Sequence, residues 1–414
     1  MKQSEVIEYK GLLAGAVEVG KYLLAAGAEV SRVENTVERI MYAYGVVEVD
    51  VFALQSFILA SVRLADGTEF TRTRRILSSG TDLRRMEELN AFSRQICAER
   101  PSAIQLRDRL LEIVAEKPNG ALTALGYVLS VFPLTLFFGG SVPDALAASV
   151  IALLFFGIDR FLRNTQYNLF VYTLFASFVE GSLAILFVQL GLGEHADKIM
   201  IGDIMLLIPG LSLCNAVKDI LHKDNLTGLG RMVEAMMVTL FIAFGFYIAS
   251  VALGGGMVNS DLPEPSPAAQ VITSAVGCVG FALYFLAKPD KLPLAFFGGG
   301  LAWALYLLAY RFYPSVFAAN AVAAAGVCLY SECMSRIVKA PANVFMITSV
   351  IPLLPGSYLY YAIAGLMSRD MAQFYDYGAR ALHTTLGIEG GFLVAYFAFT
   401  RVWSLLLLLK KKRA

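Results

Sequence analysis

From residue 121 onward, the chain consists mostly of long apolar segments separated by short polar ones. Each segment supplies about the 20 residues that a membrane-spanning helix needs. The pattern predicts ten spans, near residues 121–139, 143–161, 167–190, 199–221, 231–254, 268–287, 292–312, 315–337, 343–367 and 380–409. A glycine- and proline-rich linker, 254–267, divides them into five and five. Because five is odd, the second set would enter the bilayer from the opposite side, which is the inverted-repeat architecture.

The first 118 residues follow a different pattern, which predicts a small soluble α+β domain. Helical spacing predicts helices over 5–26, 82–99 and 102–117. Ser31 and Glu34 have the spacing of a capping box at the start of one more helix, which ends at Gly45. Alternating polar and apolar residues in 47–75 predict strands, with a hairpin at Asp66-Gly67.

Composition supports this division. Hydrophobic residues make up 57% of the chain and charged residues 16%, whereas charged residues make up about a quarter of a typical soluble domain. Residues 1–118 hold 33 of the 67 charged residues. The fold class predicted is therefore a polytopic all-α membrane protein with a soluble N-terminal domain. Its three parts would be 1–118, 119–254 and 268–414.

The predicted loops can be oriented by the positive-inside rule. Alternate loops would carry most of the basic residues and so lie in the cytoplasm, namely those with Arg160 and Arg163, Lys223 and Arg231, Lys288 and Lys291, and Arg336 and Lys339. The opposite loops would hold Lys198, Arg311, Arg369 and Arg380. Residues 1–5 show no signal-peptide pattern. We therefore expect a multi-pass protein of the inner (cytoplasmic) membrane with both termini in the cytoplasm.

An internal repeat connects the two halves. Residues 200–224 and 346–370 share eight identities at an offset of 146, including Pro209-Gly210 and Pro355-Gly356. Proline and glycine interrupt a helix because one removes an N–H and the other adds backbone freedom. Paired interruptions in two halves of a membrane protein indicate the binding site of a secondary transporter. A proline kink repaired by neighbouring helices is the alternative reading of either motif alone.

The residues at and just beyond these breaks are candidates for the substrate path. Half-helix ends attract ions, and nearby polar side chains could hydrogen-bond a substrate. The predicted path comprises Pro209, Gly210, Ser212, Asn215, Pro352, Pro355, Gly356, Ser357 and Tyr358.

Ionisable residues within apolar segments form a second group of candidates, because they are costly in a bilayer and usually functional. A carboxyl group removed from water favours its neutral form and can carry a proton. Glu180, Asp203 and Glu389 are therefore predicted to couple transport to protons, with His383 as a weaker candidate. Supporting charges nearer the cytoplasmic ends are Lys218, Asp219, Arg231, Glu234, Glu332 and Arg336. Their alternative role is structural, with Glu332 paired to Arg336 and Arg231 to Glu234.

Several other functions are disfavoured. The three histidines are His195, His222 and His383, so the front domain cannot assemble a Ser-His or Cys-His dyad. We expect no enzyme activity, and a regulatory, assembly or scaffolding role for that domain. The five cysteines form no C-x-x-C pair, and neither a metal nor a cofactor is expected. A net charge of +1 gives no case for nucleic-acid binding.

The chain also resembles the bacterial threonine/serine exporter family over nearly its whole length. The motifs that carry the resemblance are Gly27-Ala28-Glu29, Arg32-Val33-Glu34, Phe137-Phe138-Gly139-Gly140, the stretches 202–210 and 226–235, Ser331-Glu332, Arg336, Pro341, Phe345 and 352–356. Phe57 departs from the pattern, where a smaller residue is expected.

The resemblance implies export of threonine and serine across the cytoplasmic membrane, driven by the proton motive force. Some relatives are split into two proteins and are linked to export of dicarboxylates such as succinate, so a dicarboxylate exporter is the alternative. A passive channel and a membrane-embedded hydrolase built from Ser212, Ser357 and His383 are further alternatives. The predicted partners are the small-molecule substrate, protons and lipid, and homo-oligomerisation is left open.

Overall fold

The computed structural model describes residues 3–77, 80–162, 168–221, 224–254 and 262–411, and the chain forms two compact units. Within these ranges the side chains of some helical residues, Lys218 among them, are not described. Unit 1 comprises Met1–Asn119, Phe285–Lys288 and Lys339–Val344. Unit 2 comprises Gly120–Tyr284, Pro289–Val338 and Phe345–Ala414.

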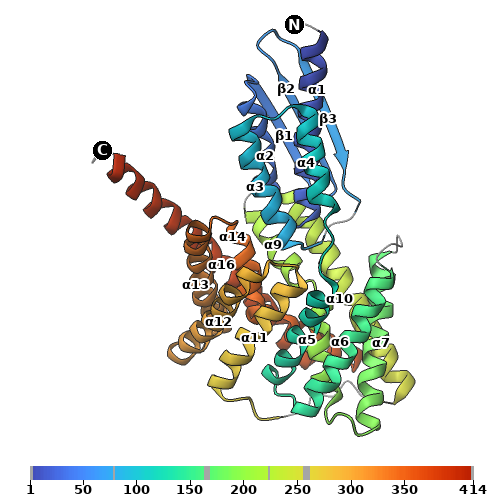
Figure 1. The fold of residues 1–414 in the computed structure, drawn as a ribbon. Coiled ribbons are helices and arrows are strands. Elements are labelled where there is room, and N and C mark those ends of the chain that lie inside the picture. Colours follow the sequence, from blue (N-terminus) through green and yellow to red (C-terminus); the bar gives the residue numbers. More distant parts are fainter. Residues whose placement is uncertain (1–2, 78–79, 163–167, 222–223, 255–261, 412–414) are drawn as a thin grey trace. The chain divides into compact units, whose positions relative to one another are not determined.

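Unit 1 is built on an antiparallel three-stranded sheet in the order β1-β2-β3 (Figure 1). The strands are β1 (Glu48–Leu54), β2 (Phe57–Arg63) and β3 (Glu69–Arg75), and the helices are α1 (Gln3–Ala25), α2 (Val30–Ala43), α3 (Leu83–Glu99) and α4 (Ala103–Ala115). On β2, alternate residues Ile58, Ala60 and Val62 are buried. Since α1 contacts β2 and β3 and α2 contacts β1, the helices and the apolar side of the sheet form the core.

Local signals in unit 1 were mostly reliable. Gly27 and Gly45 follow α1 and α2 with φ of 90° and 81°, a left-handed conformation that suits glycine. The predicted capping box at Ser31 is wrong, because Glu29 is the N-cap of α2 and Ser31 lies within the helix. Glu34 instead accepts a hydrogen bond from the backbone N–H of Ala53 at 2.8 Å, so its carboxylate ties α2 to β1.

Two segments from the apolar part of the chain fold with the front domain. The N–H of Leu83 donates to the carbonyl of Phe285 at 2.9 Å. Asn343 Nδ2 donates to Glu29 Oε1 at 2.8 Å. The loops at 285–288 and 339–344 therefore belong to the same compact unit as residues 3–119.

Unit 2 is helical throughout its described residues (Figure 1). Its helices are α5 (Gly120–Phe137), α6 (Val142–Leu162), α7 (Leu169–Gln189), α8 (Ala196–Leu207), α9 (Gly210–Leu221), α10 (Asn225–Leu253), α11 (Pro267–Tyr284), η1 (Pro289–Lys291), α12 (Leu292–Phe312), α13 (Val316–Val338), α14 (Ala342–Val350), η2 (Ile351–Leu353), α15 (Gly356–Met367) and α16 (Met371–Lys411). Seven described helices are long and apolar enough to cross a membrane. A pair bent by 44°, Ala342–Leu353 with Gly356–Met367, would make an eighth. The other two predicted spans, α8 with α9 and α16, stay predictions.

The order of helices repeats along unit 2. Adding 146 to the bounds of α8 and α9 gives 342–353 and 356–367, which are the bounds of α14 with η2 and of α15. The same offset carries the start of α10 to the start of α16. Packing repeats as well, because α7 lies on α10 as α13 lies on α16, and α10 contacts α15 as α16 contacts α9.

The first helices of the two sets, α5 and α11, pack directly against each other. A Cβ at Gly126 would lie 2.6 Å from the backbone N of Tyr284, and one at Gly277 would lie 3.3 Å from the Leu134 side chain. Between them, Gly280 meets the backbone of Leu129 and Ser130. Residue numbers rise along α5 as they fall along α11, so the two helices are antiparallel.

Gly280 provides a test of this packing. Changing Gly280→Ala should lower the free energy of unfolding by about 1–3 kcal/mol, because the added methyl overlaps the α5 backbone, which cannot move aside as a side chain can. The measurement is thermal unfolding of the purified protein in detergent. Gly157→Ala in α6 is the matched control, since its added Cβ meets nothing within 4 Å. A Gly280→Ala variant that melts with the wild type would contradict the close approach.

Candidate functional site

Both predicted helix interruptions are present. The first lies at Ile208, whose backbone is extended with φ −61° and ψ 127°, between α8 and α9. The second lies at Leu354, extended with φ −63° and ψ 141°, between η2 and α15. The proline rings at 209 and 355 remove an N–H and force the preceding residue out of the helical region. Each interruption therefore follows from local sequence.

The two interruptions lie against each other. A Cβ at Gly210 would be 3.0 Å from Leu354 Cδ1, and one at Gly356 would be 2.5 Å from Met205 Sδ and 3.5 Å from Ile208 Cδ1. Ile208 and Leu354 are themselves related by the offset of 146. The Gly210–Leu354 and Gly356–Ile208 contacts are therefore related by the repeat. Glycine at 210 and 356 permits the close approach.

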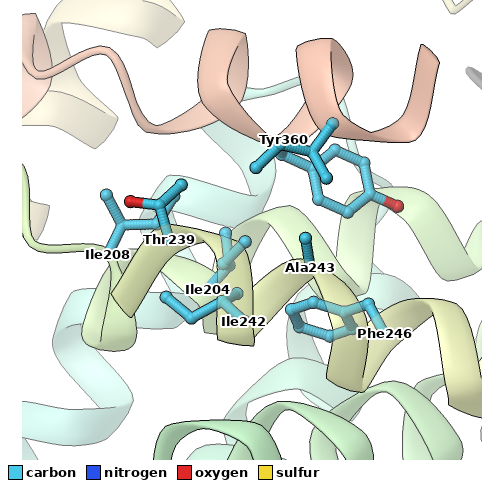
Figure 2. Close-up of a pocket in the computed structure, with 8 residues that line it drawn as sticks. Ile204, Ile208, Thr239, Ile242, Ala243, Phe246 and Tyr360 are labelled. Carbon is cyan, nitrogen blue, oxygen red and sulfur yellow. The ribbon is translucent and has the colours of Figure 1, made fainter. Parts of the chain in front are cut away.

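A small cavity lies beside this contact, as Figure 2 shows. It is bordered by side chains from α8, α10 and α15: Ile204, Ile208, Thr239, Ile242, Ala243, Phe246, Tyr360 and Ile363. Its lining is nearly all apolar, with hydroxyl groups from Thr239 and Tyr360. These hydroxyls already bond to the Ala235 carbonyl at 2.8 Å and to Met200 Sδ at 3.6 Å.

The predicted polar residues beyond the breaks do not line the cavity. Ser212 is exposed, whereas Asn215, Ser357 and Tyr358 are partly buried. Pro352, Pro355 and Gly356 are buried. The sequence thus located the breaks, but Thr239 and Tyr360 were missed because neither belongs to a Pro-Gly motif.

Two of the predicted carboxylates come together inside unit 2. Glu180 on α7 and Asp203 on α8 are 2% and 0% exposed, and neither has a hydrogen-bond partner for its oxygens among the described residues. The two helices that carry them pack on each other. Burying carboxyl groups without hydrogen-bond partners is costly, and such groups inside a membrane protein are usually functional.

The remaining predicted proton carriers lie on α16. Glu389 is 2% exposed and comes two residues after Gly387, which packs on the Phe317 carbonyl of α13. His383 is exposed. The counterpart of Glu389 at the offset of 146 is Ala243, and that of Glu180 is Gly326. The buried carboxylates therefore break the symmetry of the repeat.

Two ion pairs lie among the supporting charges. Arg336 Nη1 lies 2.6 Å from Glu332 Oε2, as the i,i+4 spacing predicts. Arg231 pairs with Asp219, at 3.4 Å between Nη1 and Oδ2, and both side chains are buried. This pair forms because α9 packs on α10, and the predicted Arg231–Glu234 pair stays a prediction. Lys218 lies outside the described side chains.

The structure also brings together charged and aromatic groups that the sequence did not single out. Lys198, predicted in a loop, is in the first turn of α8 and only 6% exposed. Its Nζ lies 3.5 Å from Asp197 Oδ2 and 3.1 Å from the Tyr361 hydroxyl. In the sequence, the adjacent Asp197 and Lys198 at the start of a repeated helix could have indicated this group. Only the fold shows that the two side chains are buried.

Among the described residues, one group of side chains has donor atoms close enough to hold a metal ion. It comprises Asp144, Glu194 and His195. Asp144 accepts hydrogen bonds from the backbone N–H groups of Ser141, Glu194 and His195 at 2.6 to 2.9 Å. Its oxygens thus secure the loop before α8.

Comparison with known proteins places this arrangement in a family. Residues 15–253 match the family described as "Putative threonine/serine exporter", and residues 270–398 match the family described as "Threonine/Serine exporter, ThrE". The threonine/serine exporter of Corynebacterium glutamicum is 21% identical over 413 residues, covering 95% of this chain and 83% of that protein.

A second relative is a protein of Mycobacterium tuberculosis named "Probable threonine/serine exporter". It is 22% identical over 407 residues, which cover 92% of this chain and 75% of that protein. No solved structure matches the chain. Because the first family match alone spans more than half of the sequence and the second covers residues 270–398 of the remainder, the chain belongs to the threonine/serine exporter family, with both parts of the family joined in one multi-pass membrane protein.

Proposed function

We propose that this protein exports threonine and serine across the cytoplasmic membrane, driven by the proton motive force, with its transport site at the interface of two inverted five-helix repeats. The repeats would occupy residues 119–254 and 268–414. The observation that carries the proposal is the reciprocal contact of the two broken helices, Gly210 on Leu354 and Gly356 on Met205 and Ile208. In secondary transporters, broken helices at a repeat interface form the substrate site.

The packing of unit 2 supports inversion of the repeats. The equivalent helices α5 and α11 run antiparallel, as the glycine contacts at 126, 280 and 277 show. The cross-contacts α10–α15 and α16–α9 are related by the same offset. An exporter of this kind would alternate access by moving one repeat relative to the other.

The composition of unit 1 supports the proposed orientation. The front domain and the loops at 285–288 and 339–344 form one compact unit, so these loops would share its side of the membrane. The positive-inside rule assigns both loops, which carry Lys288 and Lys339, to the cytoplasm. Both termini would then be cytoplasmic.

Proton coupling is assigned to the buried carboxylates Glu180, Asp203 and Glu389. Burial without hydrogen-bond partners makes the charged forms of Glu180 and Asp203 costly. These two carboxylates are therefore suited to take up a proton. His383 is a weaker candidate because its side chain is exposed. Among the supporting charges, the Arg231–Asp219 pair would hold α9 against α10.

The other functions that the sequence left open are less well supported. Among the described residues, His383 makes no hydrogen bond to Ser212 or Ser357, so a hydrolase would lack its base. A passive channel does not need buried carboxylates without partners. A dicarboxylate exporter would use the same fold, and the transport assay separates it from an amino-acid exporter.

The front domain is proposed to regulate or scaffold transport through the start of α14. Glu29 Oε1 receives the hydrogen bond from Asn343, and Asn343 is 5% exposed in the first turn of α14. Because α14 leads directly to the second break at 352–356, the chain connects this hydrogen bond to the proposed transport site.

The first prediction concerns the substrate. Cells or proteoliposomes preloaded with radiolabelled threonine, serine and succinate should lose threonine and serine faster when the protein is present, and a protonophore should abolish uphill export. Succinate efflux alone would replace the amino-acid assignment with the dicarboxylate one. Efflux that follows the solute gradient regardless of the protonophore would indicate a channel.

The second prediction concerns the site. Asp203→Asn, Glu389→Gln and the replacement of Pro209-Gly210 by Ala-Ala should each abolish proton-driven efflux while membrane expression persists, because they remove a proton carrier or straighten a broken helix. Asp376→Asn is the matched control, since Asp376 is an exposed carboxylate on α16 paired with Arg380. Normal efflux in all three variants would contradict the site assignment.

The third prediction concerns the link between Glu29 and Asn343. Glu29→Ala should lower the maximal rate of efflux and leave the apparent affinity unchanged, because it removes a contact outside the binding site. Glu29→Gln should retain efflux, since an amide oxygen can still accept the hydrogen bond from Asn343. Equal efflux rates for Glu29→Ala and the wild type would show that this contact does not regulate transport.

A further inference from the structure

A buried pair of opposite charges occupies the first turn of α8. Asp197 and Lys198 are 5% and 6% exposed. Lys198 Nζ lies 3.5 Å from Asp197 Oδ2, 3.1 Å from the Tyr361 hydroxyl and 5.8 Å from the centre of the Tyr361 ring. The charges come from the first repeat and the tyrosine from the second, so the cluster lies where the halves meet.

Close packing surrounds the cluster. On one side, a Cβ at Gly140 would be 3.2 Å from Lys198 Cβ, so the turn after α5 lies directly against the lysine stem. On the other side, Tyr361 packs on Tyr360 and Tyr377 with ring centres 5.3 and 5.0 Å apart. Tyr360 also borders the cavity beside the breaks (Figure 2). The cluster is therefore continuous with the proposed transport site.

Folding alone gives little reason to bury this pair. The 3.5 Å between Asp197 Oδ2 and Lys198 Nζ is longer than a charge-assisted hydrogen bond, so this contact offsets the cost of burying the two charges only in part. A buried ion pair also loses its hydration and is often no more stabilising than apolar residues of similar size. Charges within a membrane protein usually mark the path of a substrate or ion.

The pair has the chemistry to bind both ends of an amino acid. A lysine ammonium has three donors, and the contacts of Lys198 use two of them, which leaves one for a substrate carboxylate. The positive end of the α8 dipole would add to this attraction. Asp197 supplies the opposite charge for a substrate ammonium group.

We propose that Asp197 and Lys198 bind the charged ends of a zwitterionic amino acid, and that Tyr361 closes the site by bonding to Lys198. The inference rests on the proposed export function and names the residues that select the substrate class. A dicarboxylate would satisfy Lys198 but would place a second negative charge near Asp197. The site therefore favours threonine and serine over succinate.

The experiment measures binding of radiolabelled threonine to the full-length protein in lipid nanodiscs, with competing ligands that lack one charge. Threonine methyl ester lacks the carboxylate, and 2,3-dihydroxybutyrate lacks the ammonium. Each should compete with threonine for the wild-type protein about tenfold or more weakly than unlabelled threonine does, because each lacks one of the two charges that Asp197 and Lys198 would bind.

The variants assign each charge. Asp197→Asn should bind threonine more weakly and lose its preference for threonine over 2,3-dihydroxybutyrate. Lys198→Met should lose its preference for threonine over the methyl ester. Lys198→Arg is tested in its place if Lys198→Met does not fold. Asp376→Asn is the control, and it should retain both preferences because its exposed carboxylate lies outside the cluster.

The outcomes separate this inference from the proposed function. If proton-driven threonine efflux is present while the Asp197 and Lys198 variants keep the wild-type preferences, the pair is not the substrate site and the export function stands. If both charge-lacking ligands compete as well as threonine, zwitterion recognition is also wrong. If the wild-type protein neither binds nor exports threonine, the proposed function fails together with this inference.

Discussion

The arrangement of unit 2 depends on one constraint, which is that backbone polar groups inside a bilayer need partners. Two helices here are interrupted within the apolar part of the chain, and each interruption frees N–H and C=O groups that lipid cannot satisfy. The interruptions therefore have to be enclosed by protein. Gly210 and Gly356 allow this because each lets the opposite break approach closely, at Leu354 and at Met205. Because the sequence repeats, each break packs against the equivalent break of the other half.

The two half-helices differ in how their first turns are held. Asp197 of α8 corresponds to Asn343 of α14 at the offset of 146. Lys198, next to Asp197, bonds to Tyr361 within unit 2, whereas Asn343 bonds to Glu29 within unit 1. The same position in the repeat thus carries a charged cluster in one half and a hydrogen bond to the front domain in the other. This asymmetry is consistent with the proposed substrate site in one half and the proposed regulation through the other.

Sequence reasoning succeeded where the responsible forces are local. Proline and glycine fixed the helix interruptions, Gly27 and Gly45 ended helices in the left-handed conformation, and i,i+4 spacing identified the Glu332–Arg336 pair. It failed at Glu34, which bonds to strand β1 and does not cap its own helix. It also did not find the pairing of Arg231 with Asp219 across a helix boundary.

The sequence by itself determined the apolar segments, the repeat at an offset of 146 and the residues that interrupt the helices, because periodicity and backbone chemistry act over a few residues. Tertiary structure decided which charges are buried, since burial depends on segments far apart in the chain. Lys198 was placed in a loop by its position between apolar segments, yet it is buried between Gly140, in the turn after α5, and Tyr361 of α15. The pairing of Glu180 with Asp203 and the meeting of the two breaks likewise require α7, α8 and α15 to pack together, which no local pattern encodes.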